Sequence, residues 1–242
     1  MKAAIVIPVY KPIPDAAEQM SLDQTAAIFK GEAIFFVGPA TLDYSYYQTK
    51  IAESTIIQFE DTYFGSIQGY NRLLLSTKFY KAFEAFDYIL ITQLDVWVFS
   101  NQLQHWCDKG YDYIGAPWLE RPPLQKKINL LPMGKWMYRK VGNGGFSLRK
   151  VGTHTYISSK MKSISWLFNK NEDFFWSIVA PKIFRWFKIP ALEEAVFFAF
   201  EIAPAQAYEL TGHQLPFGVH AWQKHQPEFW KNLIPLSENQ QK

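Results

Sequence analysis

The chain of 242 residues is poor in several features that would assign a protein to a class at once. It has a single cysteine, Cys107, which excludes an internal disulfide and a cysteine-rich zinc cluster. Its formal net charge of +3 is too small to indicate a nucleic-acid partner, and we expect none. No window of 18 apolar residues is free of charge, so we expect no membrane-spanning helix.

The amino terminus also lacks the features of a targeting segment. Its apolar run, residues 3–9, is short, and no small-residue cleavage site follows it, so we expect no signal peptide. We therefore expect a cytoplasmic protein, with contact at the inner face of a membrane as an open alternative.

Two nucleotide-binding motifs are absent as well. The glycine-rich stretch VGNGGFSLRK, residues 141–150, is followed by no Gly-Lys-Ser/Thr and does not have G-x-G-x-x-G spacing, which excludes a P-loop and a dinucleotide fingerprint. We find no internal repeat and no linker. We therefore expect one domain over residues 1–236 and a polar tail at residues 237–242.

The patterns that are present indicate an α/β fold. With 48% hydrophobic residues the composition is that of a globular protein. Continuous apolar runs, typical of buried strands, alternate with helical spacings, and this alternation favours a mostly parallel sheet covered on both faces. The expected strands are residues 3–7, 33–38, 55–60 and 88–99, and the expected helices are 21–30, 66–86 and 192–201, with a loop at 215–222.

Two polar residues interrupt the apolar stretch ILITQLDVWVFS, residues 89–100. Alternate side chains of a strand share a face, so we expect Gln93 and Asp95 to point the same way. Ligands of open parallel sheets bind beyond the carboxyl ends of the strands, where a carboxylate can hold a hard cation and its phosphates. The alternative is that Asp95 caps a turn or pairs with a core arginine.

Residues 117–141 carry many prolines and cations, which predicts a long irregular loop. Long loops in compact domains are usually functional, so we expect this one to become ordered over a bound substrate. The cations expected to meet phosphates there are Lys126, Lys127, Lys135, Arg139 and Lys140.

The segment PKIFRWFK, residues 181–188, mixes cations with aromatic residues. Such a mixture is found in segments that lie at a membrane surface. The alternative is a helix that faces the core and keeps its cations in water.

Six stretches occur in an order that resembles a bacterial glycosyltransferase-like family of formerly unknown function, within the GT-A nucleotide-sugar transferase fold. They are AAIVIPVYK, GYNRLLLS, ILITQLDVWVF, GNGGFSLRK, NEDFFW and LPFGVHAW, and they span residues 3–222. The resemblance implies a Rossmann-like, mostly parallel central sheet flanked by helices, with a small antiparallel element near the active site. It implies transfer of a sugar from a UDP- or GDP-linked donor to a saccharide acceptor, in surface polysaccharide or lipopolysaccharide synthesis.

The resemblance also implies a divalent cation, Mn²⁺ or Mg²⁺. Asp95 takes the place of the last carboxylate of the family's Asp-x-Asp motif, while Gln93 replaces the first one. An amide oxygen can still ligate a cation or bond a ribose hydroxyl. His220 would be the second metal ligand, and the alternative for it is a histidine packed beside Trp222.

The resemblance places the donor against three further segments. Tyr10 would stack on the base, Lys11 would reach a phosphate, and Asn143 with the neighbouring glycine amides would contact sugar hydroxyls. Arg72 would touch the diphosphate or bridge to Asp95. For Tyr10 and Lys11 the alternative is an ordinary turn that ends a strand. For Arg72 it is a surface arginine, and for Asn143 it is a tight glycine turn. The full set of expected donor-binding residues is Pro8, Val9, Tyr10, Lys11, Asn71, Arg72, Gln93, Asn143, Gly144 and Gly145.

Residues 171–173, Asn-Glu-Asp, precede an apolar run where a helix is expected to begin. Asn and Asp are favoured helix caps, and acids suit the positive end of a helix. By resemblance to inverting GT-A enzymes, Asp173 would be the base that deprotonates the acceptor hydroxyl. Glu172 would position the acceptor or serve as the base instead.

Two other functions remain open at this point. A non-catalytic module that binds a nucleotide sugar or a glycan would also be consistent with the missing motif carboxylate. A nucleotidyltransferase or hydrolase of sugar phosphates would use similar ligands.

Overall fold

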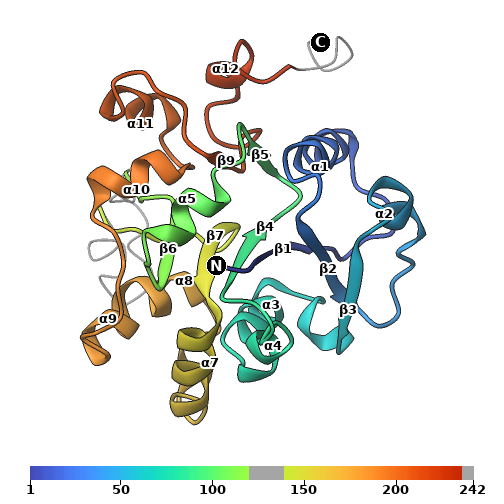
Figure 1. The fold of residues 1–242 in the computed structure, drawn as a ribbon, viewed down its shortest axis with the longest axis vertical. Coiled ribbons are helices and arrows are strands. Elements are labelled where there is room, and N and C mark those ends of the chain that lie inside the picture. Colours follow the sequence, from blue (N-terminus) through green and yellow to red (C-terminus); the bar gives the residue numbers. More distant parts are fainter. Residues whose placement is uncertain (120–138, 236–242) are drawn as a thin grey trace, which may run out of the picture.

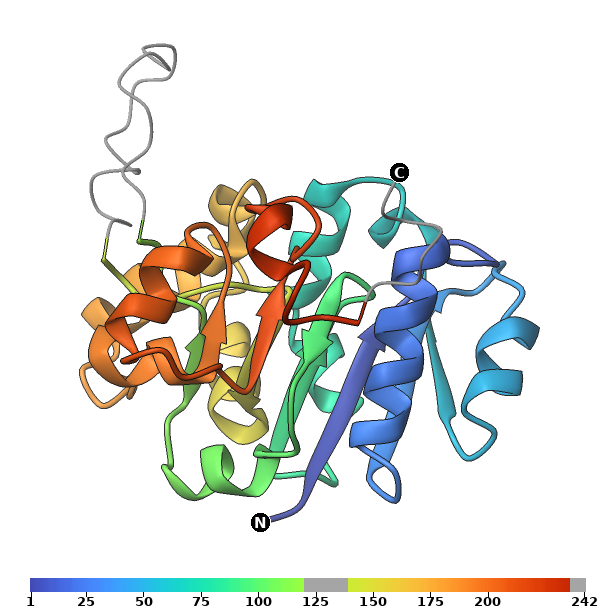
Figure 2. The same cartoon turned by 90° about the horizontal axis from the view of Figure 1, so that it is seen from above.

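A computed structural model describes residues 1–119 and 139–235 and confirms the α/β class. Its main sheet has the strand order β3-β2-β1-β4-β7-β6, in which β7 alone runs against its neighbours. Figure 2 shows β1 and β4 running the same way from the N-terminal edge. The strands are β1 (Ala3–Pro8), β2 (Ala33–Pro39), β3 (Thr55–Phe59), β4 (Tyr88–Thr92), β6 (Tyr113–Gly115) and β7 (Phe146–Lys150).

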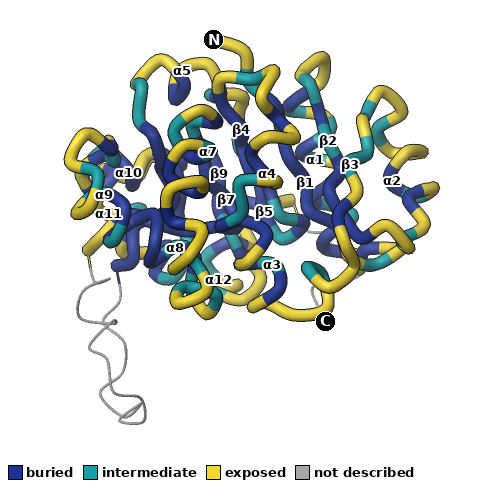
Figure 3. Tube along the Cα trace, turned by 90° about the horizontal axis from the view of Figure 1, so that it is seen from below, coloured by how far each residue is buried: buried dark blue, intermediate teal, exposed yellow. Residues whose placement is uncertain are grey.

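Helices cover both faces of this sheet because its strands are apolar on both sides (Figure 1). In β4, Tyr88 and Leu90 pack toward α1 and α5, whereas Ile89 and Ile91 pack toward α3, α4 and α7. Figure 3 shows the strands buried and the connections exposed. The helices are α1 (Ala16–Ile28), α2 (Ser45–Lys50), η1 (Asp61–Tyr63), α3 (Ile67–Leu74), α4 (Thr77–Lys81), α5 (Leu103–Asp108), α7 (Val151–Lys160), η2 (Ser165–Phe168), α8 (Glu172–Phe174), π-helix η3 (Phe175–Val179), α9 (Ala180–Ile183), α10 (Leu192–Phe198), α11 (Pro204–Leu210) and α12 (Pro227–Trp230).

A second, small sheet has the order β5-β9-β8, with β5 (Val96–Val98), β8 (Ala199–Phe200) and β9 (Gly218–His220). β5 and β9 are antiparallel, with Val96 opposite His220, and β8 and β9 are parallel, with Phe200 opposite Val219. This sheet is the small antiparallel element that we expected. It connects the end of β4 to the late segments of the chain.

Two expected elements are divided in the structure. The single strand expected at residues 88–99 is wrong, because Gln93–Asp95 form a turn that Val96 N closes on Gln93 O at 3.1 Å. β4 and β5 then belong to different sheets, which takes both polar side chains out of a buried strand. The single helix expected at residues 66–86 is also wrong, because Ser76 starts a new helix by accepting a bond from Phe79 N.

Smaller differences concern element ends. α1 begins earlier than expected because Asp15 and Glu18 form a reciprocal capping box. α10 ends at Phe198 and is followed by β8, and the expected loop at 215–222 contains β9. Residues 181–188 are helical only as far as Ile183.

Some expectations fall outside the described residues. They concern residues 120–138 of the expected loop, among them Lys126, Lys127 and Lys135, and the expected polar tail. The ends of that loop are described: Arg139 N bonds Trp118 O at 2.8 Å and Trp118 N bonds Lys140 O at 2.9 Å. Within the described ranges no helix is long and apolar enough to cross a bilayer.

Candidate active site

Three chain segments meet beyond the carboxyl end of β4. The antiparallel pairing of β7 with β4 brings the glycine turn to this edge, where Gln93 N bonds Gly145 O at 2.9 Å. The pairing of β5 with β9 brings His220 to the same place, where Ala221 N bonds Asp95 O at 3.0 Å. The site is therefore built by strand pairing between distant parts of the sequence.

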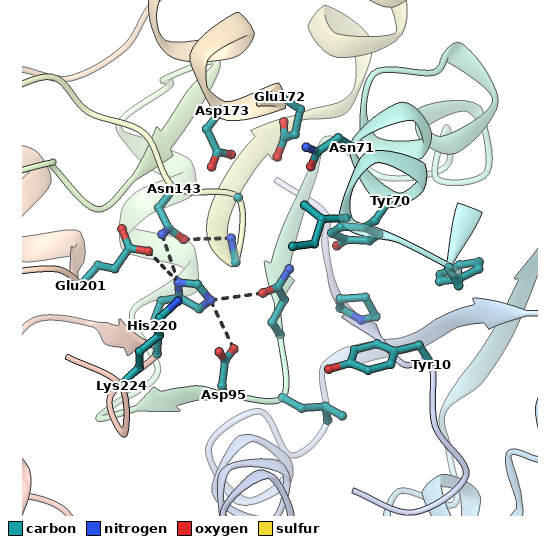
Figure 4. Close-up of a pocket in the computed structure, with 18 of the residues that line it drawn as sticks. Tyr10, Tyr70, Asn71, Asp95, Asn143, Glu172, Asp173, Glu201, His220 and Lys224 are labelled. Atoms are coloured by element: carbon teal, nitrogen blue, oxygen red, sulfur yellow. Dashed lines mark hydrogen bonds and ion pairs between the residues drawn. The ribbon is translucent and has the colours of Figure 1, made fainter. Parts of the chain in front are cut away.

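The imidazole of His220 lies at the centre of this edge (Figure 4). Its Nε2 lies 3.1 Å from Gln93 Oε1 and 3.2 Å from Asp95 Oδ1. Its Nδ1 lies 3.0 Å from Glu201 Oε1 and equally close to Asn143 Nδ2. Asn143 Nδ2 can only donate and Glu201 Oε1 can only accept, and beside this carboxylate we assign an Nδ1 proton pointing at Glu201. Gln93 and Asp95 thus point toward the same atom, as expected, although a turn and not a strand places them.

The charges around His220 stabilise its protonated form. Burial disfavours the cation, but Asp95 and Glu201 outweigh it and raise the pKa of His220 to about 10. Burial likewise opposes ionisation of Asp95, yet its contact with His220 lowers the pKa of that carboxyl. A cationic ring between two carboxylates is therefore the ground state of the site without ligands at neutral pH.

The glycine turn fits closely against these groups. Asn143 is buried, and its Oδ1 accepts bonds from Gly145 N at 2.8 Å and Phe146 N at 3.0 Å. A Cβ at Gly145 would overlap the His220 ring, and one at Gly144 would overlap carboxylate oxygens of Glu172 and Asp173. Glycine is needed here for close approach and not for a positive φ.

Gly145→Ala is expected to displace the ring of His220 from Asp95 and to move the pKa of His220 from about 10 toward its ordinary 6.5. Its matched control is Gly152→Ala in α7, where an added Cβ meets no atom within 4 Å. Histidine Cε1–H signals followed by NMR against pH measure both. An unchanged His220 titration in Gly145→Ala would contradict the packing described above.

The second half of the site is the start of α8. Asn171 caps it, with its Oδ1 accepting from Phe174 N at 2.8 Å. Glu172 is buried and pairs with Arg149 through two contacts, Nη2–Oε1 at 2.9 Å and Nη1–Oε2 at 3.2 Å. Arg149 also donates to Tyr80 Oη and Ser147 Oγ, both at 3.0 Å. Glu172 also lines the cavity, but both of its oxygens are occupied in holding the helix start, which leaves Asp173 as the carboxylate with a buried oxygen that no described residue bonds.

Asp173 faces the same cavity as His220 from the other side (Figure 4). Burial, followed by the charge of Glu172, raises the pKa of Asp173 well above its ordinary value. Its Oδ1 is buried and forms no hydrogen bond with any described residue. The same holds for Glu201 Oε2, whereas the contact of Asp95 Oδ1 is its ion pair with His220. Buried polar atoms without partners are uncommon, and their concentration here indicates a place for a ligand.

The cavity between these groups has a volume of about 600 Å³. That is the size of ordinary small-ligand sites. Its lining includes Glu18, Asp95, Glu172, Asp173 and Glu201, against the cations His220 and Lys224. Arg149 neutralises Glu172 and Lys11 neutralises Glu18, so the carboxylates that a cation accompanying an anionic ligand would meet are Asp95, Asp173 and Glu201.

The structure brings most of the expected residues together. Those that line the cavity are Pro8, Tyr10, Asn71, Gln93, Asp95, Asn143, Gly144, Gly145, Glu172, Asp173 and His220. Sequence reasoning missed Glu18, Tyr70, Glu201 and Lys224. Glu201 had a usable signal, because it directly follows an apolar run as Asp95 does.

Three expected donor-binding residues lie outside the cavity lining. The side chain of Val9 is fully buried in the core, since it alternates with Pro8 and Tyr10. Lys11 pairs with Glu18 and lies 3.5 Å from Asp15. Arg72 does not bridge to Asp95: its Nη2 donates to Thr62 O at 3.2 Å, and its guanidinium lies over the Tyr63 ring.

The atoms beside His220 Nε2 fit a divalent cation. Asp95 and Gln93 offer two oxygens next to this nitrogen, and mixed oxygen and imidazole ligands suit Mn²⁺. Glu201 on the other ring nitrogen matches the usual partner of a metal-bound histidine. Within residues 1–119 and 139–235, no group of three His, Cys, Asp or Glu is placed to hold a metal ion.

Solved structures of glycosyltransferases share this fold. Mouse xyloside xylosyltransferase 1 is 12% identical, with a TM-score of 0.54 over 91% of this chain and 97% of that one. The galactosyltransferase LgtC, solved with donor and acceptor sugar analogues, is 15% identical, with a TM-score of 0.50 over 90% and 86%. GlyE of Streptococcus pneumoniae is 14% identical, with a TM-score of 0.51 over 98% of this chain, which spans 61% of GlyE. At such identities the likeness establishes the GT-A glycosyltransferase fold.

The family itself follows from the sequence match. The chain belongs to the family described as "Protein of unknown function (DUF5672)", whose model matches residues 53–220. The match includes Asp95, the glycine turn, Asp173 and His220. No curated protein matches the chain.

Proposed function

We propose that the protein is a metal-dependent glycosyltransferase that moves a sugar from a nucleotide diphosphate sugar to a saccharide acceptor. One observation carries the proposal: buried oxygens of Asp173 and Glu201, neither hydrogen-bonded to a described residue, face one cavity beyond the carboxyl end of β4, together with the carboxylate of Asp95 that pairs with His220. Open α/β sheets bind nucleotides at that edge. The glycosyltransferase fold of the structural neighbours supports the same reaction class.

Asp95, Gln93 and His220 would hold the divalent cation, Mn²⁺ or Mg²⁺. When bound, a divalent cation supplies positive charge that neutralises the leaving diphosphate. Glu201 keeps the imidazole oriented with its Nε2 toward Asp95, and Lys224 lines the same side of the cavity, where it can contact a phosphate. Tyr10 is 59% exposed at the other end of the lining and offers a ring face to a base, uracil or guanine.

Asp173 is proposed as the general base. Its Oδ1 accepts no bond from the described protein, and its raised pKa makes it a better proton acceptor than an ordinary carboxylate. The base removes the acceptor's hydroxyl proton as the acceptor oxygen attacks the anomeric carbon, and the nucleotide diphosphate leaves from the opposite face. The product then has inverted configuration.

Glu201→Gln is expected to weaken Mn²⁺ binding about 10- to 100-fold, because an amide orients the imidazole less strongly than a carboxylate. The EPR signal of free Mn²⁺, titrated with protein in the presence of nucleoside diphosphate, measures the affinity. Glu209→Gln is the control, since Glu209 pairs with His213 on the surface. Equal affinities for both variants would remove Glu201 from the site.

A thermal-shift panel of UDP- and GDP-sugars, each with Mn²⁺, Mg²⁺ or a chelator, tests the proposed function. A shift that requires metal, followed by sugar transfer to a saccharide acceptor with release of the nucleoside diphosphate, is the expected result. A shift without turnover would favour the non-catalytic binding module, and release of pyrophosphate would favour a nucleotidyltransferase. No shift with any donor would contradict the proposal.

A further inference from the structure

A cluster of exposed aromatic and aliphatic side chains lies on α7 and residues 182–188, and the cavity chemistry does not use it. Tyr156 is 49% exposed, and Ile183 and Trp186 are each 51% exposed. The ring centroid of Tyr156 lies 6.0 Å from that of Trp186 and 6.4 Å from that of Phe184. These side chains therefore form one patch, contributed by two segments of the chain.

The patch is held firmly from the inside. Phe187 is buried and stacks on Trp176 with centroids 6.1 Å apart. The main chain of Lys188 is fixed by two bonds to Asp112, from Lys188 N to Oδ2 at 2.7 Å and from Asp112 N to Lys188 O at 2.8 Å. Trp186 is thus exposed although the segment that carries it is anchored, so its exposure is not due to a loosely packed segment.

Cations surround the patch. Lys160 lies with its Nζ 5.6 Å from the centroid of Tyr156, and Arg185 and Lys188 are exposed. Residues 139–192 hold ten Lys and Arg but only two Asp and Glu, namely Glu172 and Asp173 of the cavity. These residues, yellow to orange in Figure 1, gather in one half of the molecule. This stretch of the chain is therefore basic, although the whole chain is nearly neutral.

We propose that this face binds the surface of a bilayer containing anionic phospholipids. Trp and Tyr rings favour the boundary between headgroups and acyl chains, and each Lys or Arg near an anionic surface contributes about fivefold to binding. Burial of the Ile183 side chain in hydrocarbon is favourable, whereas its contact with phosphates or bases is not. This difference favours lipid over a nucleic acid or an acidic protein as the partner. Lys160, Arg185 and Lys188 beside the patch supply positive charge that complements the anionic headgroups.

Co-sedimentation with vesicles of phosphatidylcholine, with and without phosphatidylglycerol, tests the proposal. The protein is expected to bind only the vesicles that contain phosphatidylglycerol, and less at high salt because salt screens the charges. Arg185→Gln with Lys188→Gln is expected to lower binding about 25-fold, two cations at fivefold each. Ile183→Ala with Trp186→Ala should also release the protein from the vesicles.

Matched controls lie on other faces of the chain. Lys30→Gln with Lys50→Gln removes two exposed cations near α1 and α2, and Leu210→Ala removes an exposed apolar side chain. Both controls should bind vesicles as the unchanged protein does. The proposal would be overturned if the controls lost as much vesicle binding as the patch variants, or if the protein bound both kinds of vesicle equally. Binding to RNA or polyglutamate without binding to either kind of vesicle would also overturn it.

Discussion

Asp173→Asn is expected to lower the rate of sugar transfer by about 10²–10⁴-fold, the usual contribution of a general base. Asparagine keeps the shape of the side chain but cannot accept the acceptor's proton. Donor affinity should be nearly unchanged, because the cation side of the cavity is left intact. Initial rates and donor titrations, with the donor that the panel identifies, measure both quantities.

The same substitution is expected to stabilise the fold at neutral pH. Burial and Glu172 raise the pKa of Asp173 in the folded state, so the folded protein holds that proton more tightly than the unfolded chain does. The stability of the unchanged protein relative to Asp173→Asn should fall as the pH rises from the ordinary carboxylate range to this raised pKa, and level off above it. Urea unfolding at several pH values measures the difference.

Two results would contradict the role of Asp173. The first is full transfer activity in Asp173→Asn together with its loss in Glu172→Gln, which would make Glu172 the base. The second is a product of retained configuration. The pH profile is an additional readout, since transfer by the unchanged protein should rise as Asp173 ionises, above the ordinary carboxylate range.

Arg149→Met is expected to lower the free energy of unfolding by about 3–5 kcal/mol, because it leaves the buried carboxylate of Glu172 without its partner. Both side chains of this pair are nearly inaccessible to solvent. Adding Glu172→Gln to Arg149→Met should recover part of the loss, since a neutral amide costs less to bury than an ion. Urea unfolding of the two single variants and the double variant gives the coupling.

The surface ion pair of Lys78 and Glu60 provides the control. Its atoms lie 2.6 Å apart, but both side chains are more than half exposed. Lys78→Met should change stability far less than Arg149→Met, because water screens the exposed pair. Purely additive effects of Arg149→Met and Glu172→Gln would mean that the buried pair does not hold α8 in place.

Local patterns predicted the fold class and much of the cavity. Pro8 and Tyr10 line it while Val9 enters the core, as alternation along a strand requires. On α3, Tyr70 and Asn71 line the cavity, whereas Arg72, about 100° further round the helix, bonds Thr62 instead. Selecting every residue of a motif, without regard to this geometry, is why the expected set included Val9 and Arg72, neither of which lines the cavity.

Long-range pairing could not be predicted from the sequence. Glu201 reaches His220 because β8 lies beside β9, with Phe200 opposite Val219. No local pattern states which strands pair. The ion pair of Glu172 with Arg149 was hidden for the same reason, since 23 positions separate the two residues. By contrast, the sequence did predict that the glycines at 144 and 145 allow a close approach of the backbone. The structure shows which side chains approach them.

The most direct test of the account is calorimetric titration of the unchanged protein and of Asp95→Asn with the panel's donor, in Mn²⁺ and in a chelator. The account predicts that one donor binds per chain in Mn²⁺, that a chelator abolishes binding, and that Asp95→Asn binds no donor under either condition while still folding. Equal donor affinity with and without metal, or unchanged metal-dependent affinity in Asp95→Asn, would contradict it.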